Sequence, residues 1–180
     1  MIIKTDRIIL KSPHEVNGKE VSAYYDRNRD FAREFEPVRS EAFYTEAYQN
    51  ELLESLKEDW ESQRGYCFFI FLSDMLIGKI ALNNIVMGAF CSCFLGYGLD
   101  EMYANQGYMT EALKRVIVFA FEELKLHRIE GNIMPRNKAS RAVVEKCHFT
   151  NEGVSRKYLK INGVWEDHIH YVLLNDCFES

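Results

Sequence analysis

The segment MYANQGYMTEAL, residues 102–113, has residue types and spacing that could bind a phosphate group. It follows a run typical of a strand, and an amphipathic helical pattern starts directly after its glycine. The first N–H groups of a helix have no partner inside the helix, and the helix dipole adds partial positive charge at the same end. Gly107 permits a positive φ or a close approach of the backbone to a ligand. The segment is a candidate phosphate site, and a plain strand-to-helix turn with a glycine for its geometry is the alternative.

A second helix entrance, MPRNKASR at residues 134–141, is rich in basic side chains. Asn137 is a predicted N-cap, whose side-chain oxygen would accept from a backbone N–H two or three residues later. Arg136, Lys138 and Arg141 crowd positive charge onto the positive end of the helix, which is mildly unfavourable for folding. An anion bound there would compensate for this charge, and a solvated basic rim is the alternative.

Hydrophobic periodicity places these two entrances in a mixed α/β chain. The predicted strands are residues 2–11, 66–73, 76–86, 91–99, 127–134, 158–161 and 165–174. The predicted helices are residues 16–28, 44–63, 109–125 and 137–147. Pro37 prevents a helix through residues 34–40. Asp74 and Met75 are expected to form a tight turn, and Asn162–Gly163 is the strongest two-residue hairpin signal in the chain.

Length and composition narrow the class of protein. The 180 residues predict a single domain, 1–180, and a hydrophobic content of 47% is typical of a globular chain. A net charge of −5 argues against a nucleic-acid-binding protein, which would normally show a basic surplus. No secretory signal is visible, and the longest apolar run, CFFIFL at 67–72, is too short to span a bilayer.

Cysteine and histidine usage points to no metal site. The five cysteines lie mostly in apolar runs and lack paired zinc-ligand spacing, so we expect reduced, structural cysteines in a cytoplasmic protein. His168 and His170 lie two residues apart on one predicted strand, which resembles half of a metal site. No third ligand is suggested, and structural or surface histidines are the simpler interpretation.

Four stretches together resemble a known family. They are NRDFAREFEPVR (28–39), LGYGLDEMYANQGYMTEAL (95–113), AFEELKLHRIEGNIMPRNKASRAVVEKCHF (120–149) and EGVSRKYLKINGVWEDHIHY (152–171). Their order and spacing are similar to the GNAT acetyltransferase superfamily, and more closely to the Rim-type (RimJ- and RimL-like) protein-alanine N-acetyltransferases of ribosomal proteins. The resemblance implies an α/β (α+β) GNAT fold, with a mixed, mostly antiparallel seven-stranded sheet and about four helices. It also implies that strands four and five splay apart.

The resemblance also implies an acetyl-CoA site. Backbone groups near Leu99 would pair with the pantetheine arm, which would lie in the splay. Asn137 would lie beside the pantetheine, and Ser140 near the thiol sulfur. The basic residues of the second entrance would neighbour the remaining CoA phosphates. The turn expected to hold the pyrophosphate consists of Asn105, Gln106, Gly107, Tyr108, Met109 and Thr110.

The chain departs from the family pattern at several positions. Ala104 stands where the phosphate motif usually begins with Gln or Arg, and Met109 replaces its final small residue. The tyrosine general acid of the RimI branch would fall at Val144, and the glutamate proposed as base in RimL would fall near Leu159. Cys147 begins the Cys-His-Phe that replaces the usual Leu-Gly-Phe. The resemblance therefore supports the acetyl-CoA site better than it supports the catalytic acid and base.

A GNAT-like reaction is direct attack of an amine on the thioester, with most of the rate gained by positioning the two reactants. An N-terminal α-amine has a pKa near 7.7–8.0, so a strong base is unnecessary. Glu36, expected near the acceptor mouth, is the candidate end of a water chain that takes the proton, and a solvated loop glutamate is the alternative. Ser140 is the candidate donor to the departing thiolate, and hydrogen bonding at the helix start is the alternative.

The sequence therefore predicts an acetyl-CoA-dependent N-acetyltransferase acting on a protein N-terminal (alanine) α-amine, such as that of a ribosomal protein. Two alternatives stay open: acetylation of a small amine, and a non-catalytic acyl-CoA-binding or ribosome-associated domain. We expect no direct nucleic-acid or membrane partner, and a monomer or a homodimer.

Overall fold

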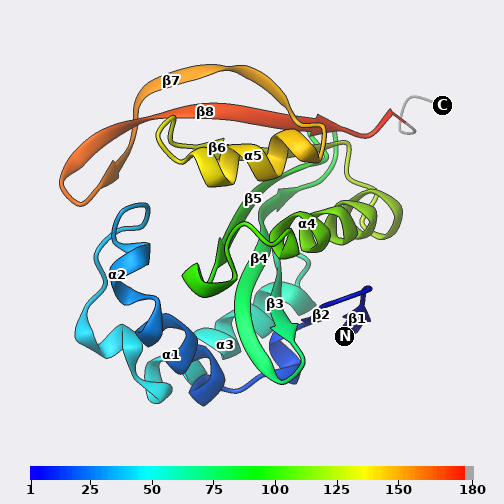
Figure 1. Ribbon diagram of the computed structural model, residues 1–180. Helices are drawn as coiled ribbons and strands as arrows, with labels where there is room; N and C mark the ends of the chain where they lie inside the picture. Colours follow the sequence, from blue (N-terminus) through cyan, green and yellow to red (C-terminus); the bar gives the residue numbers. More distant parts are fainter. Residues whose placement is uncertain (177–180) are drawn as a thin grey trace.

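The computed structural model describes residues 1–176, which form one mixed sheet with helices on both faces (Figure 1). The sheet has eight strands in the described part of the chain, in the order β1-β2-β3-β4-β5-β6-β8-β7. The strands are β1 (Ile2–Lys4), β2 (Ile9–Lys11), β3 (Tyr66–Leu72), β4 (Met75–Val86), β5 (Ser92–Leu99), β6 (Arg128–Ile133), β7 (Thr150–Ile161) and β8 (Val164–Leu174). All neighbouring strands are antiparallel except β5 and β6, which are parallel.

Three of the five helices in residues 1–176 have a side-chain N-cap. They are α1 (Gly18–Arg27), α2 (Arg29–Ala32), α3 (Glu46–Glu61), α4 (Tyr108–Val118), which continues as a π-helical turn over Phe119–Glu123, and α5 (Lys138–Lys146). Asn17 forms a capping box with Glu20 at the start of α1, and Thr45 accepts a hydrogen bond from the Tyr48 amide at the start of α3. Asn137 caps α5, as its sequence position predicted.

The predicted fold class is confirmed, with corrections to individual elements. Residues 2–11 form two short strands that pair as a hairpin, so the sheet has eight strands rather than the expected seven. The tight turn between β3 and β4 consists of Ser73 and Asp74, because Leu72 pairs with Met75. The last hairpin turns at Asn162 and Gly163, both with positive φ, as a type I′ turn requires. Its first strand is longer than predicted and begins at Thr150.

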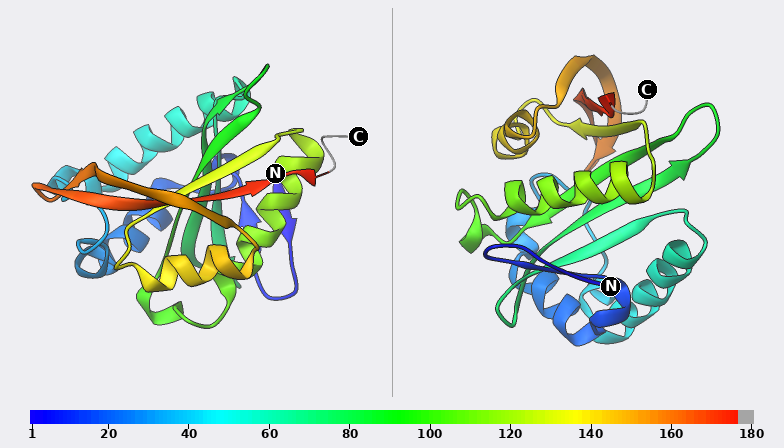
Figure 2. Two further views of the ribbon diagram at one scale, coloured as in Figure 1. Left: turned by 90° about the horizontal axis from the view of Figure 1, so that it is seen from above. Right: turned by 90° about the vertical axis from the view of Figure 1, so that its right-hand side faces the viewer.

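Two hydrophobic cores cover the two faces of the sheet. One lies between the sheet and α4, and α5 closes it with Val144. The other lies between β3, β4 and the helices α1 and α3, and its centre includes Val21, Leu53 and Phe69. Figure 2 shows α4 on the opposite side of the central strands from α1 and α3. A ligand that enters between two strands would therefore connect two separate helical layers.

The sheet opens between β5 and β6. The two strands pair only from Ser92↔Arg128 to Leu95↔Gly131. Beyond that point β5 continues to Leu99 and pairs with β4 alone, while β6 continues to Ile133 and pairs with β8 alone. The splay that the resemblance implied is therefore present, and the N-terminal ends of α4 and α5 lie on one side of it.

Candidate active site

The turn before α4 presents its backbone amides to the surface. Gly107 is the N-cap of α4 and has φ 84°, and Asn105 also lies in the left-handed region with φ 60°. The first backbone bond of the helix is Glu111 N–H to the Gly107 carbonyl, at 3.0 Å. Among residues 1–176 the amides from 105 to 110 have no hydrogen-bond partner. The predicted phosphate turn thus combines free donors with the positive end of a helix dipole.

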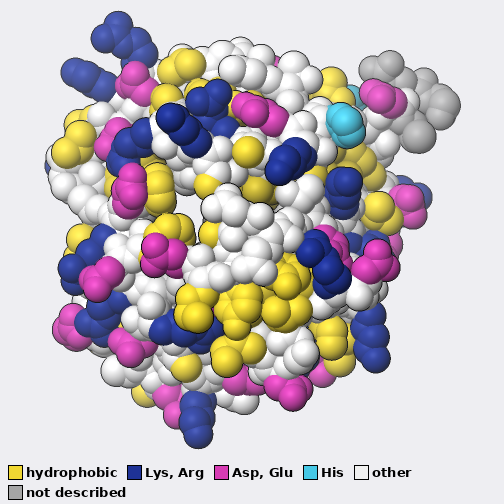
Figure 3. Space-filling view, in the orientation of Figure 1, with side chains coloured by type: hydrophobic (Ala, Val, Ile, Leu, Met, Phe, Trp, Pro, Cys, Tyr) yellow, Lys and Arg dark blue, Asp and Glu magenta, His cyan; other side chains and the backbone are white. Residues whose placement is uncertain are grey.

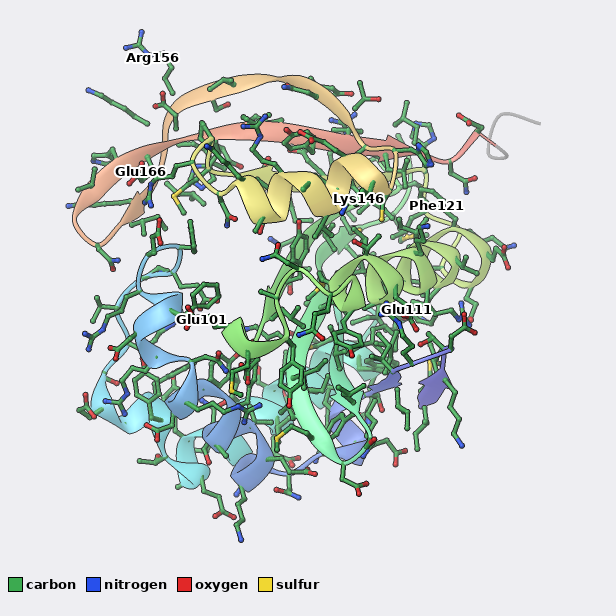
Figure 4. All side chains as sticks on the ribbon, in the orientation of Figure 1. Glu101, Glu111, Phe121, Lys146, Arg156 and Glu166 are labelled. Carbon is green, nitrogen blue, oxygen red and sulfur yellow. The ribbon has the colours of Figure 1, made fainter. Side chains whose placement is uncertain are left out.

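Arg7, from the turn between β1 and β2, holds this segment in place. Its guanidinium donates to the Gln106 carbonyl at 2.9 Å and to Glu111 Oε2 at 2.7 Å, and it lies over the Tyr108 ring. Thr5 donates to the other oxygen of Glu111 at 2.6 Å. Figure 4 labels Glu111 on the side of α4 that faces this hairpin. Burial opposes ionisation of Glu111, but the hydrogen bonds from Thr5 and Arg7 outweigh it and lower its pKa.

The two departures at the phosphate motif have a structural explanation. Met109 is only 4% exposed and belongs to the core under α4, so its side chain points away from the free amides. Ala104 supplies no charge, but its amide closes a tight turn on the Glu101 carbonyl at 3.1 Å. The basic side chain beside the turn comes instead from Arg7. Sequence analysis missed this residue because it lies about a hundred positions from the turn, and no local pattern links the two.

The start of α5 faces the open end of β5. Asn137 Oδ1 accepts from the Ser140 amide at 3.0 Å, and the Tyr97 hydroxyl of β5 donates to the Ser140 carbonyl at 2.8 Å. Burial raises the pKa of Tyr97, so its hydroxyl stays a donor at neutral pH. The Ser140 hydroxyl itself has no hydrogen-bond partner in the described residues. Capping of α5 is therefore done by Asn137, which leaves the serine hydroxyl available.

The basic residues of this second entrance are largely occupied by the protein. Arg136 donates to Glu166 at 2.8 Å and to the Glu34 carbonyl at 3.0 Å. Arg141 donates to the Tyr171 hydroxyl at 3.1 Å. In Figure 4 Glu166 lies on β8 above the loop that follows α2, so Arg136 ties the last hairpin to this loop. The protein's own acceptors therefore bind the two arginines, and no bound anion is needed to explain their positive charge at the start of α5.

A cavity of about 430 Å³ lies on the other face of the sheet, between α1, α3 and the strands β3 to β5. Its wall includes Glu36, Lys79, Gln49 and the backbone of Gly96. A Cβ placed on the neighbouring Gly98 would lie 3.8 Å from Glu36 Oε1 and 3.4 Å from the Tyr24 hydroxyl. Gly96 therefore presents the backbone of β5 to the cavity just past the point where β5 leaves β6. Glu36 lies at that end of the cavity.

Lys79 is the cation in the wall of this cavity. Its Nζ lies 5.0 Å from the centre of the Tyr25 ring. Burial lowers the pKa of Lys79, but the interactions with Tyr25 and Glu36 outweigh burial and raise it overall, so the side chain is an ammonium at neutral pH. Sequence analysis did not single it out. The available signal was a lone lysine inside an otherwise apolar strand, LIGKIAL.

Other predicted features lie away from this region. The His170 ring bonds Ser155 at 2.6 Å and Glu130 at 3.1 Å, and His168 bonds the Glu166 carbonyl, so both histidines have structural partners. Within residues 1–176, no group of three or more His, Cys, Asp and Glu could hold a metal ion. The four cysteines of the described chain are free thiols, and Cys177 lies outside the described residues.

The surface and the helix lengths give two further observations. On the face of the molecule seen in Figure 3, Lys and Arg side chains are interspersed with Asp and Glu rather than gathered into one basic stripe. No helix of residues 1–176 has the length and apolar character needed to cross a bilayer.

Comparison with known proteins identifies the class. Residues 7–150 match the family described as an acetyltransferase (GNAT) domain, so the chain belongs to the GNAT acetyltransferase family. It is 40% identical over 176 residues to the probable N-acetyltransferase YjcK of Bacillus subtilis, covering 97% of both chains. It is 32% identical over 169 residues to the [ribosomal protein uS5]-alanine N-acetyltransferase of Escherichia coli, covering 93% of this chain and 87% of that one.

Among solved structures, the ribosomal-protein-S5-alanine acetyltransferase from Vibrio fischeri superimposes with a TM-score of 0.92, at 30% identity and with full coverage of both chains. The predicted family and enzyme class are therefore confirmed: the chain is an N-acetyltransferase of the GNAT type, related to ribosomal-protein alanine acetyltransferases.

Proposed function

We propose that this enzyme transfers the acetyl group of acetyl-CoA to the N-terminal α-amine of a protein, such as a ribosomal protein with N-terminal alanine. The observation that carries the proposal is the opening between β5 and β6 beyond Leu95. The amides of residues 105–110 lie at its α4 side, and Glu36 lies beside β5 in the cavity on the other face. The opening thus connects a site suited to a diphosphate with a site suited to an amine.

The donor side fits a CoA thioester. Gly107 lacks the Cβ that would meet Arg7 at 3.3 Å, and its left-handed conformation directs successive amides outward. Asn105, Gln106, Tyr108, Met109 and Thr110 would contribute the remaining backbone donors of the pyrophosphate site. Leu99 and Asn137 would flank the pantetheine arm. Acetyl-CoA, when bound, supplies an acyl group activated as a thioester.

The protein's own groups would then handle two protons. A fair fraction of an α-amine with a pKa near 7.7–8.0 is already neutral at pH 7, so the carboxylate of Glu36 would need only to receive a proton through water. The free hydroxyl of Ser140 would pass a proton to the leaving sulfur as it takes up the proton that the acetylated nitrogen releases, so the hydroxyl is restored. A backbone amide of β5 beyond Leu95 would stabilise the negative charge that develops on the carbonyl oxygen.

A protein acceptor is supported by the surface around the cavity as well as by the relatives. Asn162, at the tip of the β7–β8 hairpin, accepts from the Val38 amide at 2.8 Å and donates to the Arg33 carbonyl at 2.7 Å. The hairpin and this loop carry exposed apolar side chains, among them Val38 at 66%, Val164 at 58% and Trp165 at 56%. Exposed apolar side chains beside a site are typical of a surface that contacts another protein.

An acceptor panel tests the proposal. Purified enzyme and acetyl-CoA are mixed with a peptide beginning with alanine, with the same peptide acetylated at its N-terminus, and with spermidine. We expect thiol release and a mass increase of one acetyl group only for the free peptide. Acetylation of spermidine with no transfer to the peptide would contradict the assignment of the acceptor. Binding of acetyl-CoA with no transfer to any amine would contradict catalysis.

A further inference from the structure

Lys79 and Gln49 are polar groups in the wall of the cavity beside β5 that the proposed chemistry does not use. Gln49 is fully buried, and its Nε2 donates to the Phe43 carbonyl at 2.5 Å, which fixes the orientation of the amide. Its Oε1 is buried and receives no hydrogen bond from any described residue. Lys79 forms no ion pair within residues 1–176, and the Tyr25 ring is its near neighbour. Gln49 Oε1 therefore lacks a donor, and Lys79 has no carboxylate at ion-pair distance in the described part of the chain.

The charges of the cavity wall disfavour a polycationic acceptor. Lys79 and Arg39 contribute two positive charges, and Glu36 contributes one negative charge. Glu36 Oε2 is also 3.8 Å from Arg39 Nη2, so its charge is already shared. A polyamine would add further ammonium groups to a site with a positive surplus, and like charges at short distance repel. An acceptor that offers an oxygen to Lys79 avoids this cost.

The order of the polar groups across the sheet matches the start of a polypeptide. Glu36 lies against Gly98 of β5, Lys79 is on β4 and pairs with Gly98, and Gln49 is on α3, which packs on β3. Neighbouring strands are about 4.8 Å apart, so the path from β5 to β3 is roughly 10 Å. An extended chain covers that distance in about three residues. Along a peptide the amine is followed by a carbonyl oxygen and then by an N–H, which are the groups that Glu36, Lys79 and Gln49 would each bind.

We propose that Lys79 and Gln49 are specificity-determining residues that select an acceptor beginning with an extended peptide. Lys79 donates to the first carbonyl oxygen, and Gln49 Oε1 accepts from the N–H of the second or third residue. The inference rests on the proposed function and narrows it, because a plain alkylamine offers neither group. A cavity of 430 Å³ is within the range of about 300–1,000 Å³ usual for ligand sites, and it is far larger than one alanine methyl group requires.

The test compares Lys79→Met with wild type on two acceptors, trialanine amide and isopropylamine. Isopropylamine keeps the first Cα and its methyl group but has no carbonyl. Lys19→Met is the matched control, because Lys19 is an exposed residue of α1. We expect Lys79→Met to lower kcat/KM for trialanine amide by about tenfold or more, as the loss of a charged hydrogen bond implies. Its effect on isopropylamine and on the KM for acetyl-CoA should stay within about twofold.

The double comparison separates specificity from general damage. Each acceptor is compared with itself across proteins, so differences in amine pKa cancel. An equal loss on both acceptors, or no loss on either, would overturn the role of Lys79. Trialanine amide methylated at the nitrogen of residue two or residue three tests Gln49 in the wild-type protein, without any risk to folding. If both methylated peptides react as well as the parent, the role of Gln49 is wrong.

Failure of the proposed function would be recognised separately. If wild type transfers acetyl to no amine, the proposed function falls, and calorimetric binding of trialanine amide to the enzyme with CoA then decides the role of Lys79. Weaker binding by Lys79→Met than by Lys19→Met would support the inference. Equal binding by the two variants would overturn it.

Discussion

Replacement of Gly107 by alanine should separate the stability of the phosphate turn from its binding role. Gly107 has φ 84°, and a left-handed conformation costs an L-residue about 1–2 kcal/mol. Each kcal/mol shifts the melting temperature of a domain of this size by about 2–4 °C, so Gly107→Ala should lower Tm by about 2–8 °C. The new Cβ would also lie 3.3 Å from Arg7 Nη2, which must move slightly. Relief of this strain would rotate the amides that follow.

The matched control is Gly163→Ala. Gly163 has a similar φ of 86°, in the β7–β8 turn, and nothing lies within 4 Å of a Cβ placed on it. Both variants should lose similar stability, but only Gly107→Ala should lose affinity for acetyl-CoA. Loss of one charged hydrogen bond corresponds to about a tenfold weaker Kd.

Thermal unfolding with and without acetyl-CoA measures this difference. At 100 times the wild-type Kd, the ligand should stabilise wild type and Gly163→Ala by about 2.7 kcal/mol, but Gly107→Ala by only about 1.4 kcal/mol. A cofactor-induced rise in Tm that is as large in Gly107→Ala as in Gly163→Ala would refute the role of this turn.

Three further substitutions test other parts of the site. The contacts of Glu111 hold its pKa below the usual 4.5. The ionised carboxylate therefore stabilises the fold above pH 4.5, and this stabilisation is lost as the pH falls through the lowered pKa. The free energy of unfolding of Glu111→Gln, measured with urea, should therefore depend less on pH below about 4.5 than that of wild type. The same pH dependence in both proteins would argue against the contacts with Arg7. Ser140→Ala should lower kcat at least about tenfold with little change in the KM for acetyl-CoA, and an unchanged kcat would remove its donor role. Glu36→Gln should slow transfer most below about pH 8, where the amine is protonated, and a deficit that is constant with pH would exclude proton transfer by Glu36.

Local patterns predicted the elements that hold the site. Strand-like runs rich in apolar residues identified β3 to β6, and apolar residues at helical spacing identified α3 and α4, because each of these elements buries one or both faces in a core. The Asn162–Gly163 turn was predictable because both residues tolerate positive φ. The N-cap role of Asn137 followed from its residue type and its position before a helical pattern.

Contacts between distant segments could not be predicted in the same way. Residues 2–11 alternate like one strand, and only pairing with β3 shows that they fold back as a hairpin. The hairpin places Arg7 beside Gln106 and Glu111, and this contact depends on tertiary packing alone. The proposed roles of Lys79 and Gln49 likewise depend on the cavity that α1 and α3 close over β4, which no local pattern predicts.

A crystal structure of the enzyme with bound CoA at about 2 Å resolution is the most direct test of how the cofactor binds. We predict pyrophosphate oxygens within hydrogen-bond distance of main-chain nitrogens between residues 105 and 110, and the pantetheine arm lying between β5 and β6 past Leu95. CoA bound elsewhere on the protein would contradict this prediction, and so would β5 and β6 paired beyond Leu95 when CoA is present.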